Sequence, residues 1–132
     1  MKFIPEKVDE KSLKLATKKM ALEAIKLVNA LPNTRAGDVL GKQFLRSASS
    51  VAANYRAACR ARSDSEMLSK LGIVEEEADE SCLWLELLVE SDTCKSEMAT
   101  HLHPEFSRMT AIAVASRRTL RAGIEKRGNK TR

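Results

Sequence analysis

The sequence predicts an all-α protein, an antiparallel up-down-up-down four-helix bundle. Apolar residues recur at steps of three and four along long segments of the 132-residue chain. The whole chain has only five glycines and three prolines, and of these only Gly41 and Gly72 lie inside the long periodic segments. No stretch alternates strictly between apolar and polar residues as a half-buried strand does. The hydrophobic fraction of 43% is typical of one globular domain. Aromatic residues make up only 4%, so we expect an aliphatic, alanine-rich core.

The first helix is expected over residues 11–31. Asp9 or Ser12 can cap its start, because both side chains accept hydrogen bonds from free backbone N–H groups. Pro32 ends it, since proline lacks the N–H that a continuing helix needs. A short connection follows, of the length usual between antiparallel neighbours in a bundle. Residues 1–9 are expected to form an extended lead-in.

The second and third helices are expected over residues 38–62 and 64–91. The apolar seam of the second consists of Leu40, Phe44, Ala48, Val51, Tyr55 and Ala58. The third begins at a capping-box pattern, in which Ser63 is the N-cap and the Glu66 side chain is expected to accept a hydrogen bond from the Ser63 backbone N–H. Its seam consists of Leu68, Leu71, Val74, Ala78, Cys82, Leu85 and Leu88. Together the two segments predict a long helical hairpin at the centre of the fold.

The fourth helix is expected over residues 104–122, with Pro104 at its first position, where a missing N–H costs nothing. Residues 93–103, which include both histidines, are expected to be a loop or a frayed turn. Residues 125–132 carry nothing apolar to bury and are expected to be a disordered basic tail. The four-helix bundle is therefore assigned to residues 1–124, as a single domain.

The formal net charge of +5 lies at one end of the chain. Residues 117–132 contain seven Lys or Arg and one acid, a charge of +6, which leaves −1 for the rest. The body is therefore near neutral and is not a general polyanion binder. No signal sequence or membrane-spanning apolar run is evident, and the three cysteines have no metal-binding spacing. We therefore expect reduced thiols in a cytoplasmic protein that does not bind a membrane.

Basic residues at two places are candidate nucleic-acid contacts, because a row of cations can follow a phosphate backbone. The candidates are Arg46, Arg56, Arg60 and Arg62 of the second helix, and Arg117, Arg118, Arg121, Lys126 and Arg127 near the C-terminus. The alternative for the second helix is a solvated face, or ion pairing with the acids of the third. Those acids are Glu75, Glu76, Glu77, Asp79 and Glu80. The sequence leaves both interpretations open.

An oligomer interface is expected around the apolar stretch of residues 83–88. This stretch is apolar around much of its circumference, whereas a small bundle buries one stripe of each helix. The excess predicts a subunit interface with Trp84, Leu87 and Tyr55 as candidate contacts. An alternative use of Trp84 in the core stays open.

No pattern in the sequence predicts an enzyme. Gln43, Ser47 and Asn54 lie near the apolar seam of the second helix, where buried polar groups fix register or specify an oligomer. A catalytic pocket there would need a base, and no histidine is near in sequence. His101 and His103 lack further ligands at metal spacing. We therefore predict no catalytic residue, no metal, no cofactor and no small-molecule substrate.

Several motifs resemble a family of small bacterial four-helix-bundle proteins, the proteins of intervening sequences in large-subunit ribosomal RNA. The motifs are Leu31-Pro32, Gly37 to Gln43, Leu45-Arg46-Ser47, Ser50 to Arg56, Ala58 to Ser63, Lys70-Leu71, Glu77 to Ser81 and Trp84 to Leu88. This resemblance implies a bundle assembled into a ring-like homo-oligomer, a pentamer, with a proposed role in nucleic-acid binding. It supplies no catalytic motif.

A related bundle family is that of the accessory variability proteins of diversity-generating retroelements. The resemblance implies a basic pentameric barrel that binds nucleic acid and a reverse transcriptase, whereas the body of this chain is near neutral. The expected function is therefore that of a non-enzymatic homo-oligomer associated with RNA or a ribonucleoprotein. The alternative is a scaffold or accessory subunit that binds proteins and makes no direct contact with nucleic acid.

Overall fold

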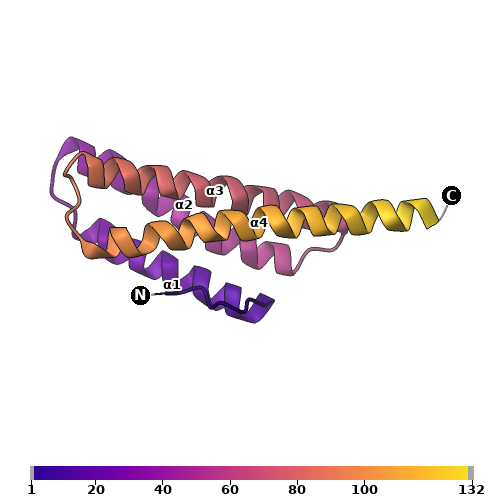
Figure 1. The fold of residues 1–132 in the computed structure, drawn as a ribbon. Coiled ribbons are helices and arrows are strands. Elements are labelled where there is room, and N and C mark those ends of the chain that lie inside the picture. Colours follow the sequence, from indigo (N-terminus) through magenta and orange to yellow (C-terminus); the bar gives the residue numbers. More distant parts are fainter. Residues whose placement is uncertain (1, 131–132) are drawn as a thin grey trace.

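The computed structural model describes residues 2–130, and these form an all-α bundle of four helices. The helices are α1 (Glu10–Asn29), α2 (Arg35–Cys59), α3 (Asp64–Glu90) and α4 (Glu97–Lys130). They lie lengthwise beside one another, with short connections at their ends (Figure 1). α3 packs against both α2 and α4, whereas α1 packs mainly against α2 and touches α4 little. The predicted all-α class is confirmed, and no strand occurs within residues 2–130.

Side-chain caps define the starts of the first two helices. The Asp9 carboxylate accepts a hydrogen bond of 2.7 Å from the Ser12 backbone N–H, and the Ser12 hydroxyl accepts one of 3.0 Å from the Asp9 N–H. These reciprocal bonds form a capping box. α2 begins earlier than expected, because Thr34 caps it by accepting a 3.0 Å bond from the Gly37 N–H. The capping residues therefore locate the first residue of each helix more accurately than the apolar pattern does.

The third helix begins where its capping signal predicts. Ser63 is the N-cap and accepts a 3.1 Å bond from the Glu66 N–H. The Glu66 carboxylate, however, accepts from the N–H of Arg62, one residue before the cap, at 3.4 Å. Acidic residues in the first turn also favour this helix end, because the partial positive charge of the N-terminus attracts carboxylates.

The fourth helix is longer at both ends than expected. It begins at Glu97, so that Pro104 lies inside it and not at its first position. Ala99 and Leu102, on the N-terminal side of the proline, are almost fully buried. Burial of these side chains keeps the turns before Pro104 helical, although proline removes one backbone hydrogen bond.

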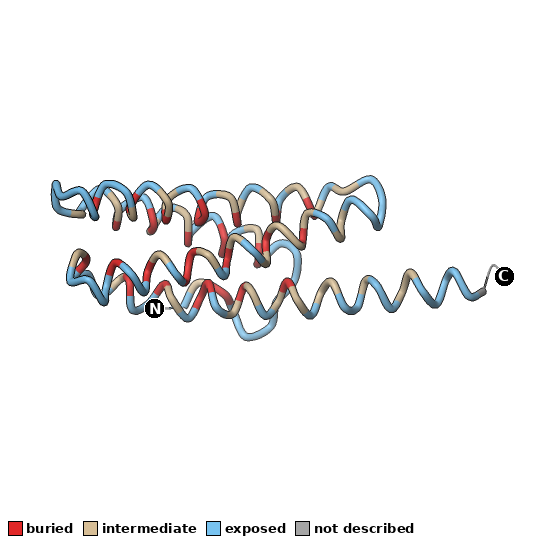
Figure 2. The backbone as a smooth tube through the Cα atoms, turned by 90° about the horizontal axis from the view of Figure 1, so that it is seen from above, coloured by how far each residue is buried: buried red, intermediate tan, exposed pale blue. Residues whose placement is uncertain are grey.

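The C-terminal end of α4 also differs from the expected disordered tail. Residues 125–130 continue the helix, and residues 131–132 lie outside the described part of the chain. This end projects beyond the other helices, with its side chains mostly exposed (Figure 2). An ion pair between Arg127 and Asp64, at the start of α3, holds the projecting helix against the bundle. The helix therefore continues beyond its buried stripe with exposed side chains and an ion pair to α3.

The core that joins the four helices consists mostly of aliphatic side chains and alanines, with a few aromatic and polar contacts between helices. The Phe44 and Phe106 rings of α2 and α4 meet edge to face, with centroids 5.9 Å apart. The buried hydroxyls of Ser47 and Ser81 lie 2.8 Å apart between α2 and α3. Gly41 lets α1 and its C-terminal turn approach α2 closely, since a Cβ there would lie 2.9 Å from a methyl of Leu31. No helix within residues 2–130 is long and apolar enough to cross a membrane.

Asp92, just after α3, has a left-handed backbone with φ of 59°. The N–H groups of Asp92 and Thr93 bond to the carbonyls of Val89 and Leu88, the Schellman pattern in which glycine usually takes this position. We predict that Asp92→Gly raises the free energy of unfolding by about 0.5–1 kcal/mol, because glycine carries no Cβ penalty there. Urea unfolding followed by circular dichroism measures this change. Asp92→Ala is the control and should be no more stable than the parent chain.

Candidate nucleic-acid interface

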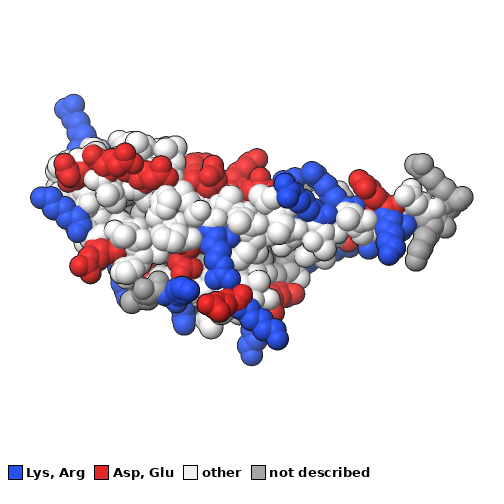
Figure 3. Space-filling model, viewed as in Figure 1, with Lys and Arg blue, Asp and Glu red and all other residues white. Residues whose placement is uncertain are grey.

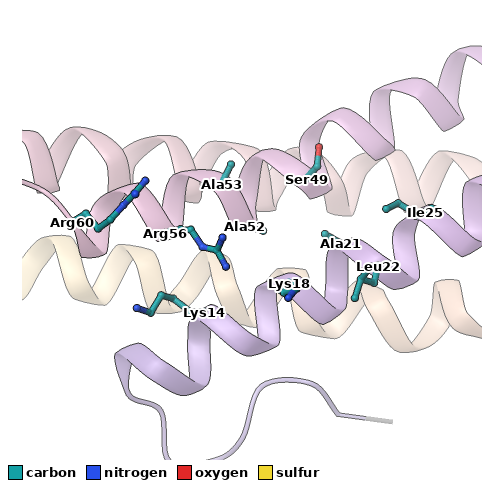
Figure 4. Close-up of a pocket in the computed structure, with 10 residues that line it drawn as sticks. All are labelled: Lys14, Lys18, Ala21, Leu22, Ile25, Ser49, Ala52, Ala53, Arg56 and Arg60. Atoms are coloured by element: carbon teal, nitrogen blue, oxygen red, sulfur yellow. The ribbon is translucent and has the colours of Figure 1, made fainter.

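A cationic groove of about 450 Å³ runs between α1 and α2. Two lysines from α1, Lys14 and Lys18, and two arginines from α2, Arg56 and Arg60, line it (Figure 4). Its remaining lining residues are apolar or small, and they are Ala21, Leu22, Ile25, Ser49, Ala52 and Ala53. We call this hollow the α1–α2 groove.

Helix geometry places the four cations together. Lys14 and Lys18 are four residues apart on α1, and Arg56 and Arg60 are four apart on α2, so each pair lies on one face of its helix. Four residues correspond to a rise of about 6 Å along a helix axis. Small residues on both walls hollow out the space between the helices, since an alanine side chain ends at Cβ. The result is a cluster of positive charge at one end of the groove, with Leu22 and Ile25 toward the other end (Figure 4).

The groove is electropositive because no carboxylate lines it. One ion pair joins Lys14 to Glu10, at 3.5 Å, with the Lys14 side chain partly exposed and that of Glu10 largely exposed to solvent. Lys18, Arg56 and Arg60 form no ion pair within residues 2–130. Three of the four cations are therefore free to bind an anion without breaking an existing pair.

Three other predicted cations are engaged with acids of α3. Arg46 is 3.1 Å from Glu77 and also pairs with Glu80, and the Glu77 carboxylate raises the pKa of Arg46. Arg117 is 3.1 Å from Glu75. Arg127 pairs with Asp64 at the start of α3, as described above. These three arginines therefore form ion pairs with acids of α3. The basic residues that the sequence predicted as nucleic-acid contacts do not form one surface.

The remaining predicted cations lie elsewhere on the molecule. Arg62 borders a second hollow at the turn between α2 and α3, together with Arg60, Glu66 and Lys70. Arg118, Arg121 and Lys126 are exposed on α4 and do not line the groove. Figure 3 shows acidic side chains along α3 and basic ones gathered near the C-terminal part of α4. The basic end of α4 and the α1–α2 groove are thus separate cationic surfaces.

The three candidate interface residues have different environments. Leu87 is 41% exposed, and Trp84 is half-buried with its indole N–H donating to Glu80 at 3.3 Å. Tyr55 is only 8% exposed, and burial raises the pKa of its hydroxyl. The fold uses Tyr55 in the core of one chain, since its position on the apolar seam of α2 turns it inward. Leu87 and Trp84 remain accessible on the outer side of α3, near exposed Leu83.

Lys14 and Lys18 were absent from the sequence-based set, although they contribute half of the charge in the groove. Their spacing of four residues is visible in the sequence, but it is also the ordinary pattern of a solvated helix face. Only the packing of α1 beside Arg56 and Arg60 distinguishes the two uses. The role of these two lysines therefore depends on a tertiary contact, which the sequence pattern does not record.

The chemistry of the groove is that of anion binding. Its lysines and arginines supply N–H donors and no acceptor, and no carboxylate or imidazole lines it. Elsewhere, His103 lies 2.9 Å from Glu86 on the surface. Within residues 2–130, no cluster of three or more His, Cys, Asp or Glu residues is arranged to hold a metal ion.

Comparisons with known proteins show which family and which solved structure the chain is similar to. A family model described as "23S rRNA-intervening sequence protein" matches residues 11–115. A crystal structure of a protein of unknown function, from the S23 ribosomal protein family of Bacteroides thetaiotaomicron, is 28% identical in sequence. The match covers 83% of this chain and 97% of that chain, with a TM-score of 0.74. No curated protein matches the chain at a significant level.

Proposed function

The chain belongs to the 23S rRNA-intervening sequence protein family, and from this premise we propose that it is a non-enzymatic RNA-binding protein. The α1–α2 groove holds the phosphate backbone of RNA, either free or within a ribonucleoprotein. One observation carries the proposal, the convergence of four cations from two helices, of which only Lys14 is paired with a carboxylate within residues 2–130. The resemblance noted in the sequence is confirmed by the family match, and it favours RNA over other polyanions.

The composition of the groove indicates how RNA is recognised. No aromatic side chain lines it, so bases have no stacking platform there. Lysine and arginine contacts to phosphates are independent of sequence and give affinities that fall steeply with salt. The proposed binding is therefore salt-sensitive and largely indifferent to sequence.

We further propose that the protein acts in the cytoplasm as an up-down-up-down bundle assembled into a ring-like homo-oligomer. Two unlike apolar surfaces support this proposal. One lies on α3 around Leu83 and Leu87, and the other on α1 around Leu15, Leu22 and Ile25, with exposed fractions between 41% and 54%. Leu22 and Ile25 lie toward the end of the groove away from Lys14, Arg56 and Arg60, so a subunit contact there leaves that basic end open (Figure 4). A contact between unlike surfaces repeats from head to tail and closes into a ring when its rotation allows. Light scattering on the native protein measures the mass of the assembly and the number of subunits.

A protein-interaction scaffold is the second candidate function. Its support is the internal pairing of Arg46, Arg117 and Arg127, which removes three cations from nucleic-acid binding. The apolar end of the groove, at Leu22 and Ile25, also fits a protein partner (Figure 4). A scaffold should purify without nucleic acid, whereas an RNA-binding protein should carry nucleic acid that high salt releases. The ratio of absorbance at nucleic-acid and protein wavelengths, before and after high salt, separates the two functions.

Neutralising the groove arginines should weaken RNA binding. We predict that Arg56→Gln with Arg60→Gln lowers affinity for a labelled single-stranded RNA about tenfold. The slope of log affinity against log salt should flatten by about 1.4, which corresponds to two lost phosphate contacts. Fluorescence anisotropy over a series of salt concentrations measures both quantities.

Arg118→Gln with Arg121→Gln is the matched control. These two exposed arginines lie on α4, outside the groove, and their replacement changes the net charge by the same amount. Its affinity should stay within twofold of the parent chain. If the control pair weakens binding and the groove pair does not, the RNA site lies on α4. If the parent chain binds no RNA at low salt, the RNA-binding proposal itself fails.

A further inference from the structure

The N-terminal lead-in is held to α4 through its backbone. We call residues 3–6 the N-terminal strap. The Glu105 carboxylate is 5% exposed, and each of its oxygens accepts one backbone hydrogen bond from the strap. The Phe3 N–H donates at 3.0 Å and the Ile4 N–H at 3.1 Å. One buried carboxylate therefore binds two consecutive backbone amides.

Arg108 completes the contact from the next turn of α4. Its guanidinium donates to the carbonyl of Ile4 at 2.9 Å and to that of Glu6 at 3.3 Å. Glu105 and Arg108 are three residues apart and so share one face of the helix. The pair presents an acceptor and a donor that fit the bent backbone of the strap, because a bend turns the N–H groups of Phe3 and Ile4 to the same side. The lead-in is therefore bent at these residues, and not extended as the sequence predicted.

The side chain of Ile4 supplies the apolar part of the contact. It is fully buried and belongs to the same hydrophobic cluster as Leu102 and Phe106 of α4. Beside the strap, a cleft of about 400 Å³ is bordered by Glu105 and Arg108. Backbone recognition together with one aliphatic anchor is the chemistry of a peptide-binding site.

We propose that this face of α4 is a peptide-binding site and that the strap is its resident ligand. The site accepts the same segment from a second copy of the chain. All four polar contacts are to the strap backbone, so they are retained whichever copy supplies the strap. An empty site would lose these four hydrogen bonds and the burial of the Ile4 side chain, whereas exchange keeps both. The strap precedes the region that the family model matches, which begins at residue 11.

A strap in the same chain competes strongly with any added peptide. A short tether gives an effective concentration in the millimolar range, so a free peptide binds the parent chain only weakly. Ile4→Ser removes the aliphatic anchor of the resident strap and should open the site. The full-length Ile4→Ser protein is therefore the proper receptor for a binding experiment.

The probe is a labelled synthetic peptide with the sequence of residues 2–9, acetylated at its N-terminus. We expect saturable binding to Ile4→Ser protein at least tenfold tighter than to the parent chain. Adding Glu105→Gln to that receptor should weaken binding at least tenfold, because the amide has one acceptor oxygen in place of two. A peptide with serine in place of isoleucine should not bind.

Two results would overturn the proposal. One is a normally helical Ile4→Ser protein that binds no peptide at millimolar concentration, and the other is peptide affinity that Glu105→Gln leaves unchanged. If Ile4→Ser fails to fold, the parent chain gives the answer by nuclear magnetic resonance. Excess unlabelled peptide should then shift the amide signals of Phe3 and Ile4 toward those of a free strap, and unchanged signals would exclude exchange.

Discussion

Replacing Phe44 by alanine should lower the free energy of unfolding by about 3–5 kcal/mol. Phe44 is fully buried, and its ring meets that of Phe106 edge to face at 5.9 Å. Alanine removes the ring and leaves a cavity between α2 and α4, which a close-packed core fills only in part. Small domains are stable by about 5–15 kcal/mol, so this one change removes a large share of the total.

Urea unfolding followed by circular dichroism measures the loss. Val39→Ala is the control on the same helix, because Val39 is 57% exposed and its truncation should change stability by no more than about 0.5 kcal/mol. Equal, small effects of the two substitutions would mean that Phe44 does not join α2 to α4 in solution.

The central hairpin of the fold follows from the sequence because its signals are local. In α2, the seam residues from Phe44 to Ala58 are buried, and only Leu40 at its start is half-buried. In α3, the seam is buried from Leu71 to Leu88. A helix turns by about 100° per residue, so a stripe at steps of three and four must face one side. Wherever one side is buried, this periodicity is sufficient to identify the core.

The limits of α4 depend on contacts that no local pattern records. The sequence predicts that α4 starts at Pro104, but the helix begins earlier, where Ala99 and Leu102 are buried. No periodic pattern marks Glu105 as buried, because its partners are backbone amides of the lead-in about a hundred residues away in sequence. Helix periodicity cannot identify partners that are this far apart in the sequence.

The candidate site could be predicted only in part. Arg56 and Arg60 were identified from their spacing, and they do line the groove. Arg46 belongs to the same series, but the register of α2 against α3 places it opposite Glu77 and Glu80. Helix angles place residues around one axis, whereas the neighbour at each height depends on how two helices are aligned along their length. That alignment separates a paired arginine from one that is free to bind phosphate.

Cys82 should react with an alkylating reagent at pH 8 about a hundredfold more slowly than a thiol of the unfolded chain. Burial, with smaller contributions from Asp79 and Glu86, raises the pKa of the Cys82 thiol from 9.0 to about 11. Only the thiolate reacts, and the shift lowers its fraction at pH 8 from about one in ten to about one in a thousand. Iodoacetamide labelling followed by mass spectrometry of the peptides measures the rate, with urea-unfolded protein as the reference.

The same shift predicts how stability depends on pH. The unfolded chain loses the Cys82 proton near pH 9 and the folded chain near pH 11, so the folded state binds more protons between these values. The contribution of Cys82 is therefore fully present below pH 9 and is lost as pH rises to 11, by on the order of 2 kcal/mol. Cys82→Ala should lose less stability than the parent chain over that interval. Equal losses in the two proteins, or rapid labelling of Cys82 at pH 8, would show that the thiol is exposed to solvent and that α3 and α4 do not close over it.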